Sequence, residues 1–213
     1  MAPRPYKTIE HDSETELIIQ KSRFLGRAFR VGTEEEVNAV LSRIRKQHYD
    51  ATHNCYAYSL GINGELARFS DDGEPGGTAG LPMMEAVRQK GVTNVLVIVT
   101  RYFGGILLGA GGLVRAYSKS CSLAVEQAGI VSMTPGVRLS LTLDYPLYGA
   151  IEGFLRENTC DFEAAFSDRV TITAAVGEED RARVQKEITE RTLGRVPVLF
   201  GESVYMKKRL EKA

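Results

Sequence analysis

The stretch VLVIVTRYFGGILLGAGGLVR, residues 95–115, decides the fold of this chain. Its first part, residues 95–99, is an uninterrupted apolar run rich in β-branched side chains, which predicts a buried strand. Arg101 follows where that strand should leave the core, and a helix is expected to begin near Leu113. Five glycines in this stretch allow turns with positive φ or the close approach of a ligand: Gly104, Gly105, Gly109, Gly111 and Gly112.

A strand, a glycine-rich loop and a helix N-terminus together form a candidate anion site. Unpaired backbone N–H groups and the helix dipole both attract negative charge, and Arg115 and Lys119 lie four residues apart on one helix face. No Gly-Lys-Ser/Thr follows the loop, so it is not a Walker A sequence. The glycine spacing does not match the dinucleotide fingerprint either. The alternative is a glycine-rich turn that only lets the helix pack tightly on the sheet.

Composition restricts the class of protein. Hydrophobic residues make up 43% of the 213 residues, which excludes a disordered chain and allows one large or two modest domains. The 27 Lys and Arg balance the 27 Asp and Glu, which excludes a generally basic nucleic-acid-binding coat but not a local basic groove. The odd number of cysteines and the lack of a Cys-x-x-Cys pair favour reduced thiols over disulfides or a zinc site.

The N-terminus has no apolar signal-peptide core, and no window has the length of a membrane-spanning helix. We therefore expect a soluble, cytoplasmic protein without a membrane partner. No His-x-x-x-His pair is present to hold a metal. Neither a metal nor another cofactor is expected.

Patterning over residues 1–132 predicts a first domain of mixed strands and helices. Thr33, followed by Glu36 as a capping-box partner, should open a helix whose apolar stripe includes Val37, Leu41 and Ile44. Further helices are expected over residues 81–90 and 113–128. Besides residues 95–99, strands are expected over residues 16–20, 24–31, 54–60 and 66–69.

Residues 133–213 predict a second domain. Residues 130–136 contain Pro135 and Gly136 and have the composition of a boundary. The elements beyond it follow in the order strand 137–145, helix from Pro146, strands 160–166 and 170–176, helix 178–193 and strand 196–206. This βαββαβ order is the ferredoxin-like pattern. The domain holds no histidine, which favours a structural or interaction role.

Five polar residues form a possible polar cluster: His53, Asp71, Asp72, Glu74 and Thr78. The histidine could act as a base or a ligand, and the acids could serve acid–base chemistry or hold a divalent cation. Equally, the histidine could be a hydrogen-bonded structural residue, and the acids could cap the helix that begins near Leu81. Thr78 has no partner that spacing identifies for nucleophilic catalysis.

The tripeptide Arg101-Tyr102-Phe103 offers a different chemistry. A guanidinium beside exposed aromatic rings suits phosphate contact and base stacking. The sequence therefore predicts a binding surface made of Arg101, Tyr102, the five glycines and Arg115, with Arg68 and Lys119 beside it.

Taken together and in this order, the motifs closely resemble the IMPACT/YigZ family. The match rests on THNCYAY at residues 52–58, SDDGEP at 70–75, GTAG at 77–80 and the block over residues 94–117. It covers roughly residues 15–130 for the defining domain, and the βαββαβ unit resembles the companion domain of bacterial members.

The resemblance implies an α+β protein of two domains. The first would resemble a ribosomal protein and domain IV of elongation factor G, an α/β sandwich with helices on one face of the sheet. The second would resemble domain V of the same factor. Both analogies point to RNA, ribosomes or translation factors as partners, at the level of fold. Eukaryotic relatives regulate translation initiation by competing for an activator of a stress kinase. They carry an additional N-terminal interaction domain and lack the C-terminal one, so that role is not transferred to this chain.

Three function hypotheses follow. The first is a non-enzymatic RNA- or ribosome-associated protein linked to translation or its regulation, which would use the glycine–arginine surface. The second is an enzyme acting on a phosphorylated small molecule or peptide, which would need His53 and the acids Asp71, Asp72 and Glu74 to converge. The third is a protein–protein interaction module, whose aromatic residues would lie on an apolar patch.

Overall fold

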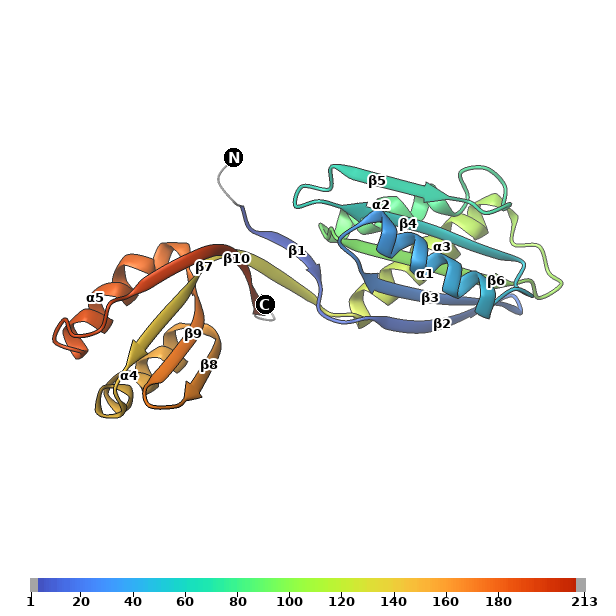
Figure 1. Ribbon diagram of the computed structural model, residues 1–213. Helices are drawn as coiled ribbons and strands as arrows, with labels where there is room; N and C mark the ends of the chain where they lie inside the picture. Colours follow the sequence, from blue (N-terminus) through green and yellow to red (C-terminus); the bar gives the residue numbers. More distant parts are fainter. Residues whose placement is uncertain (1–3, 210–213) are drawn as a thin grey trace. The chain divides into compact units, whose positions relative to one another are not determined.

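The computed structural model describes residues 4–209, which divide into two compact units. The first unit holds Tyr6–Ser132, together with Arg209. The second holds Met133–Lys208, together with residues 4 and 5. Figure 1 shows that each unit combines helices with a sheet, so the expected α+β class with two domains is confirmed.

The first unit is built on a five-stranded antiparallel sheet in the order β2-β3-β6-β4-β5. The central strand β6 contains the apolar run of residues 95–99, as the sequence predicts. The strands of the unit are β1 (Tyr6–Ile9), β2 (Ser13–Ile19), β3 (Ser22–Arg30), β4 (His53–Leu60), β5 (Leu66–Ser70) and β6 (Val95–Tyr102). Its helices are α1 (Glu34–Gln47), α2 (Gly80–Lys90) and α3 (Gly109–Gln127).

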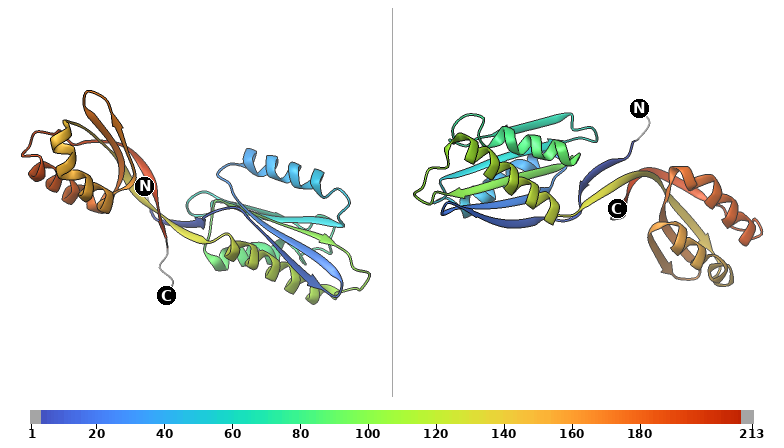
Figure 2. Two further views of the ribbon diagram at one scale, coloured as in Figure 1. Left: turned by 90° about the horizontal axis from the view of Figure 1, so that it is seen from below. Right: turned by 180° about the vertical axis from the view of Figure 1, so that it is seen from behind.

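Helices cover both faces of this sheet, so the expectation of helices on one face only is wrong. Figure 2 shows α1 on one side and α2 with α3 on the other. The reason lies in β6, because its successive side chains point to opposite faces. Leu96 and Ile98 pack in the core under α1, whereas Val95, Val97 and Val99 pack in the core under α2 and α3. An apolar run without alternation needs cover on both faces.

The helix starts are set by local chemistry. Thr33 caps α1 as predicted, because its side chain accepts a hydrogen bond from the Glu36 backbone N–H at 3.2 Å. The Glu36 carboxylate accepts from Gly32 instead of closing the box on Thr33. Helix α3 begins at Gly109, four residues before the predicted start. The last three glycines of the stretch therefore lie in its first turn.

The second unit has the order β7-α4-β8-β9-α5-β10. Strand β9 pairs with β8 on one side and with β7 on the other, and β10 also pairs with β7, which is the ferredoxin-like arrangement. A short 3₁₀ turn at Glu178–Asp180 opens the helix that was predicted from residue 178. The elements are β7 (Ile130–Leu143), α4 (Tyr145–Asn158), β8 (Cys160–Phe166), β9 (Val170–Gly177), α5 (Arg181–Arg191) and β10 (Leu199–Arg209).

Residues 130–136 do not form a connecting loop. They belong to β7, which continues through Pro135 and Gly136. Although proline and glycine favour turns, the chain stays extended here, because Gly136 pairs with Gly177 of β9. Among residues 4–209, no helix is both long and apolar enough to cross a membrane. The same residues hold no group of three or more His, Cys, Asp and Glu side chains that could bind a metal ion.

Candidate functional site

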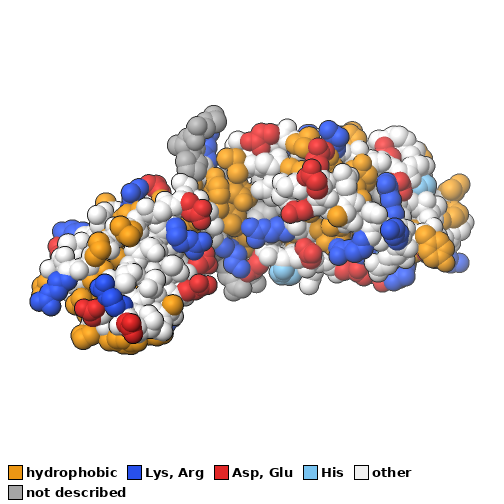
Figure 3. All heavy atoms as spheres, viewed as in Figure 1, with side chains coloured by type: hydrophobic (Ala, Val, Ile, Leu, Met, Phe, Trp, Pro, Cys, Tyr) orange, Lys and Arg blue, Asp and Glu red, His pale blue; other side chains and the backbone are white. Residues whose placement is uncertain are grey.

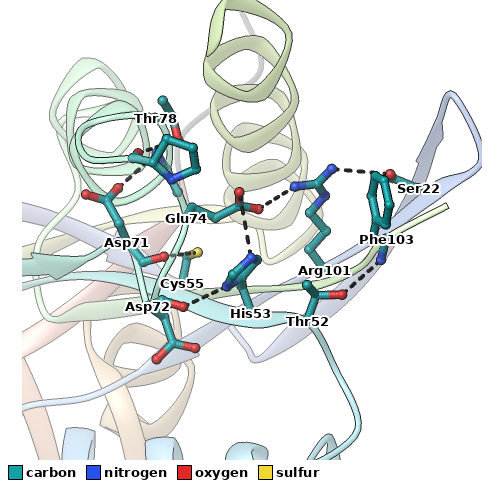
Figure 4. A network of polar contacts seen from close by, with 12 residues as sticks. Ser22, Thr52, His53, Cys55, Asp71, Asp72, Glu74, Thr78, Arg101 and Phe103 are labelled. Atoms are coloured by element: carbon teal, nitrogen blue, oxygen red, sulfur yellow. Dashed lines mark hydrogen bonds and ion pairs between the residues drawn. The ribbon is translucent and has the colours of Figure 1, made fainter. Parts of the chain in front are cut away.

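A buried ion pair lies where β6 leaves the core. Arg101 is 5% exposed, and its Nη1 donates to Oε1 of Glu74 at 2.7 Å (Figure 4). Its Nη2 donates to the Ser22 hydroxyl at 3.4 Å. The guanidinium carbon lies 5.5 Å from the ring centroids of both Phe24 and Phe103. Arg101 is therefore held inside the fold and is not the exposed phosphate contact that the sequence predicts.

Glu74 joins three elements through its carboxylate. Tyr117 of α3 donates its hydroxyl to Oε1 at 2.6 Å, and Nε2 of His53 lies 3.8 Å from Oε2. The other ring nitrogen of His53, Nδ1, lies 2.8 Å from the Asp72 carbonyl oxygen, which can only accept, so Nδ1 carries a proton. Burial and the contact with the Glu74 carboxylate raise the pKa of Tyr117, which keeps it a neutral donor. We call His53, Glu74, Arg101 and Tyr117 the buried polar cluster.

Asp71 serves the backbone of the loop before α2. Its carboxylate accepts hydrogen bonds from the N–H groups of Gly77, Ala79 and Gly80 at 2.8–3.0 Å. Burial acts to raise the pKa of Asp71, but the three donors outweigh it and lower the pKa below its ordinary value. Asp71 thus satisfies the donors at the start of α2, which is the alternative that the sequence analysis left open.

The other predicted polar residues of this loop are also engaged. Asp72 accepts from the Asn54 backbone N–H at 2.7 Å and from Arg45 at 3.4 Å. Thr78 donates its hydroxyl to the Pro75 carbonyl at 2.7 Å. Of the five residues of the possible polar cluster, only His53 and Glu74 bring their side chains together.

The neighbouring thiol of Cys55 is buried and unreactive. Cys55 donates to the Asp71 carbonyl at 2.9 Å, and burial raises the pKa of this thiol to about 12. A thiol with so high a pKa is a poor nucleophile near neutral pH. Through the contacts of Glu74 with Arg101 and Tyr117, the buried polar cluster holds the loop of residues 70–80 against β6 and α3.

Tyr102 points to the opposite face of the sheet from Arg101. Its hydroxyl lies 2.8 Å from Nδ1 of His48 and 3.2 Å from the Asp50 carboxylate. Nη2 of Arg27 lies 2.7 Å from Nε2 of His48. Because arginine only donates, His48 accepts there and is neutral. Burial and then the Arg27 charge lower the pKa of His48.

Sequence reasoning missed this second network, although two signals could have found it. Adjacent strand residues face opposite ways, so Arg101 and Tyr102 could not share one surface. In addition, Arg27 interrupts an otherwise apolar strand and is 4% exposed, which requires polar partners. Its Nε donates to Glu14 at 2.6 Å, and its Nη1 donates to Thr100 at 3.2 Å.

Arg68 also lies away from Arg101. It belongs to β5, and its guanidinium is 3.5 Å from the carboxylate of Glu34 in the first turn of α1. Arg68 is thus part of the α1 face of the sheet, whereas Arg101 points toward α2 and α3.

Most of the glycine-rich segment from Gly105 to Gly111 is exposed to solvent. Gly104 is the exception, because a Cβ there would overlap the backbone of Lys21. Its N–H donates to the Ser22 hydroxyl at 3.2 Å, which pins the loop to the turn between β2 and β3. Beyond it, the loop exposes 41% of Ile106 and 85% of Leu107. Gly105 and Gly109 adopt positive φ angles of 82° and 70°.

The first turn of α3 has no side-chain cap and no acidic residue. Gly109 and Gly111 are exposed, and Arg115 and Lys119 extend the exposed face along the next two turns. Arg115 donates from Nε to the Gly111 carbonyl at 3.2 Å, which places its guanidinium over the first turn. Helix start and cations thus form the arrangement expected of an anion site.

The fold and the site define the class of protein. The family model described as the Impact N-terminal domain matches residues 20–125, and the model described as a domain of unknown function, DUF1949, matches residues 141–195. The class is therefore a two-domain protein with an Impact N-terminal domain and a ferredoxin-like second domain.

The chain belongs to the IMPACT family. It is 40% identical to IMPACT family member YvyE of Bacillus subtilis, over 95% of this chain and 94% of that protein. It is 37% identical to IMPACT family member YigZ of Escherichia coli, over 78% and 85% of the two chains. The protein IMPACT homolog of Dictyostelium discoideum is 42% identical over 42% of this chain and 27% of its own length. A solved structure described as a hypothetical protein has a TM-score of 0.61 at 30% identity and covers 94% of this chain and 98% of its own.

Proposed function

We propose that this chain binds RNA, free or in the ribosome, without catalysing a reaction, and that it serves translation or its regulation. The contact surface would be the loop of residues 103–108 with the first three turns of α3, through Lys119. We call it the α3 surface. It keeps the glycines, Arg115 and Lys119 of the sequence prediction and leaves out Arg68, Arg101 and Tyr102 as direct contacts.

The observation that carries this proposal is the uncapped first turn of α3 beside Arg115 and Lys119. Four N–H groups at a helix start lack intrahelical partners, and they suit an anion such as a phosphate. The two cations supply the charge that makes phosphate contacts strong and salt-dependent.

Phe103 favours RNA as the ligand that supplies the phosphate. Phe103 is 45% exposed, and its ring lies against the Arg101 guanidinium. A fixed aromatic ring beside cations favours stacking of unpaired bases, which are common in RNA loops and ends. Arg101 would then act indirectly, by holding Phe103 in place.

The geometry gives catalysis less support. Asp71, Asp72 and Thr78 bind the backbone of their own or neighbouring segments. Glu74 is neutralised by Arg101. The carboxylates that the enzyme hypothesis requires to converge are thus occupied by structural contacts.

The test is binding of the purified protein to a fluorescent RNA hairpin with a single-stranded tail, and to ribosomes, across a salt series. The Arg115→Ala/Lys119→Ala variant should bind at least about tenfold more weakly, and the slope of log affinity against log salt should be shallower by about 1.4. The matched control is Arg181→Ala/Lys186→Ala on α5, which removes two exposed cations of the second unit. Equal loss in both variants, or no binding at low salt, would refute the proposal.

A protein partner is the second candidate, favoured by the exposed apolar side chains of Ile106 and Leu107. Loss of ribosome binding in Ile106→Ser/Leu107→Ser, with hairpin binding unchanged, would assign the loop to a ribosomal protein or a translation factor. Loss of hairpin binding in that variant would instead place the loop against RNA.

A further inference from the structure

A shallow groove of about 460 Å³ lies along the flank of α1, between this helix and β4. Its polar lining residues are Asn38, Ser42, Arg45, Lys46, Tyr49 and Tyr56. Three of them, Asn38, Ser42 and Arg45, recur along α1 at intervals of four and three residues, which places them on one helix face. The apolar stripe that packs on the sheet, with Val37 and Ile44, lies beside this face, and Leu41 of the stripe also lines the groove. The groove thus presents polar side chains on the flank of α1, over the buried side chain of Leu41.

Two aromatic rings line this groove. Tyr49 is 86% exposed in the loop after α1, which is unusual for so large an apolar ring. Tyr56 of β4 is half-buried, and its ring is stacked on Tyr58 at a centroid distance of 6.3 Å and an interplanar angle of 13°. Tyr58 is itself fixed, because its hydroxyl donates to Glu34 at 2.6 Å. The groove therefore offers one supported ring and one free ring for stacking.

The cations of α1 gather at the same end. The first turn carries Glu34, Glu35 and Glu36, whereas the last turn carries Arg45 and Lys46. Figure 3 shows this division, with acidic side chains over the start of α1 and basic ones over its second half.

Of these two cations, Arg45 has one long ion-pair contact, and Lys46 has none among the described residues. Arg45 pairs with Asp72 at 3.4 Å, but their side chains are 50% and 30% exposed, and ion pairs in contact with solvent contribute little. Within the part of the chain that the structure describes, no carboxylate pairs with Lys46.

We propose that this groove binds a nucleoside phosphate, with the base against Tyr49 and Tyr56 and the phosphate on Arg45 and Lys46. Asn38 and Ser42 supply hydrogen-bond donors and acceptors along the groove. The nucleotide is a free molecule or one residue of an RNA strand. In the second case the proposal rests on the proposed function, to which it adds a second contact.

The loop after α1 connects this groove to the α3 surface. Thr52 accepts a hydrogen bond on its hydroxyl from the Phe103 N–H at 3.0 Å, and its own N–H donates to the Arg101 carbonyl at 2.9 Å. Residues 49 and 103 thus lie on two segments that are bonded to each other. A single strand that contacts Phe103 can continue across this loop toward Tyr49.

Two titrations test the groove. In the first, adenosine and uridine monophosphates are added to the isotope-labelled full-length protein, and the backbone amide signals of α1 are followed by NMR. In the second, fluorescence anisotropy measures binding of a single-stranded RNA oligonucleotide. Tyr49→Ala should weaken both interactions about tenfold, and Tyr49→Phe should preserve them, because stacking requires the ring and not the hydroxyl. Lys46→Ala should make the salt slope shallower by about 0.7, and Lys46→Arg should restore it.

Wild-type affinity in Tyr49→Ala and a wild-type salt slope in Lys46→Ala would overturn the assignment. Tighter binding of the monophosphates than of the oligonucleotide would identify a free nucleotide as the ligand, and the converse would identify RNA. Arg115→Ala/Lys119→Ala separates the two proposals, because it should weaken oligonucleotide binding while the monophosphates still shift the α1 signals. If wild type binds no RNA, the proposed function fails, but α1 shifts that disappear in Tyr49→Ala would still support the groove. No shift with the monophosphates and no oligonucleotide binding would refute both.

Discussion

Replacing Arg101 with methionine should lower the free energy of unfolding of the first unit by about 3–5 kcal/mol. The side chains of Arg101 and Glu74 are 7% and 3% exposed, and their closest N···O distance is 2.7 Å. Methionine fills much of the space between Phe24 and Phe103 but leaves the Glu74 carboxylate buried without its counter-charge. The penalty thus comes from an isolated charge, not from a cavity.

Removing both charges separates this explanation from simple loss of packing. In Arg101→Met/Glu74→Leu no charge remains to be desolvated, and the main residual cost is the Tyr117 hydroxyl without its acceptor, about 1–3 kcal/mol. The free energy of unfolding of the double variant should therefore be at least about as high as that of the more stable single variant. Replacement of a buried ion pair by apolar residues is often neutral for the same reason.

The assay is hydrogen exchange of the β6 amides, because a chain of two units does not give a single unfolding transition. Arg23→Met is the matched control, since Arg23 pairs with Glu16 at 2.8 Å but both side chains are about half exposed, and the expected loss is about 0–1 kcal/mol. The reasoning is refuted if Arg101→Met costs no more than this control, or if the double variant loses the sum of the two single losses.

Three further outcomes are expected. Gly104→Ala should destabilise the first unit by about 2 kcal/mol or more, because its Cβ would overlap the backbone of Lys21; an unchanged thermal midpoint would contradict this close approach. Burial lowers the pKa of His48 below the ordinary value of 6.5, so the unfolded chain takes up a proton first as the pH falls. Urea titrations should show stability decreasing below about pH 6.5, and His48→Asn should lack this component. Iodoacetamide should modify Cys160, which is half-buried, before Cys55, which is buried and has a pKa of about 12. Mass spectrometry reports the order of modification. Faster modification of Cys55 would mean that the loop of residues 70–80 opens.

Much of the fold could be predicted because its signals are local. The β-branched run in β6, the Thr33 cap and the βαββαβ order each depend on a few neighbouring residues. The cover on both faces of the first sheet was not predicted, although β6 lacks the alternation of a half-exposed strand. The start of α3 was misplaced because glycine propensity argues against a helix at Gly109, and packing of Leu113 and Tyr117 on the sheet overrides it.

The sequence drew attention to several residues of the candidate site but could not show their contacts. His53, Glu74 and Arg101 come from three separate motifs, and they meet in the structure. Which side chain is exposed depends on contacts between segments far apart in the chain, such as Glu74 with Tyr117 at a separation of 43 residues. Short-range patterns carry no information on these pairs, so the sequence could not show that Arg101 is neutralised inside the protein.

The glycines in the first turn of α3 also affect how quickly a complex would form and separate. Each glycine weakens a helix by roughly 0.5–1 kcal/mol relative to alanine, so this turn frays more readily than the rest of α3. A phosphate that binds the N–H groups of the turn must also order it, and the loss of chain entropy offsets part of the attraction. In the proposed complex, the glycines that open the backbone to a ligand would thus shorten the lifetime of binding, which would suit a partner bound briefly and repeatedly.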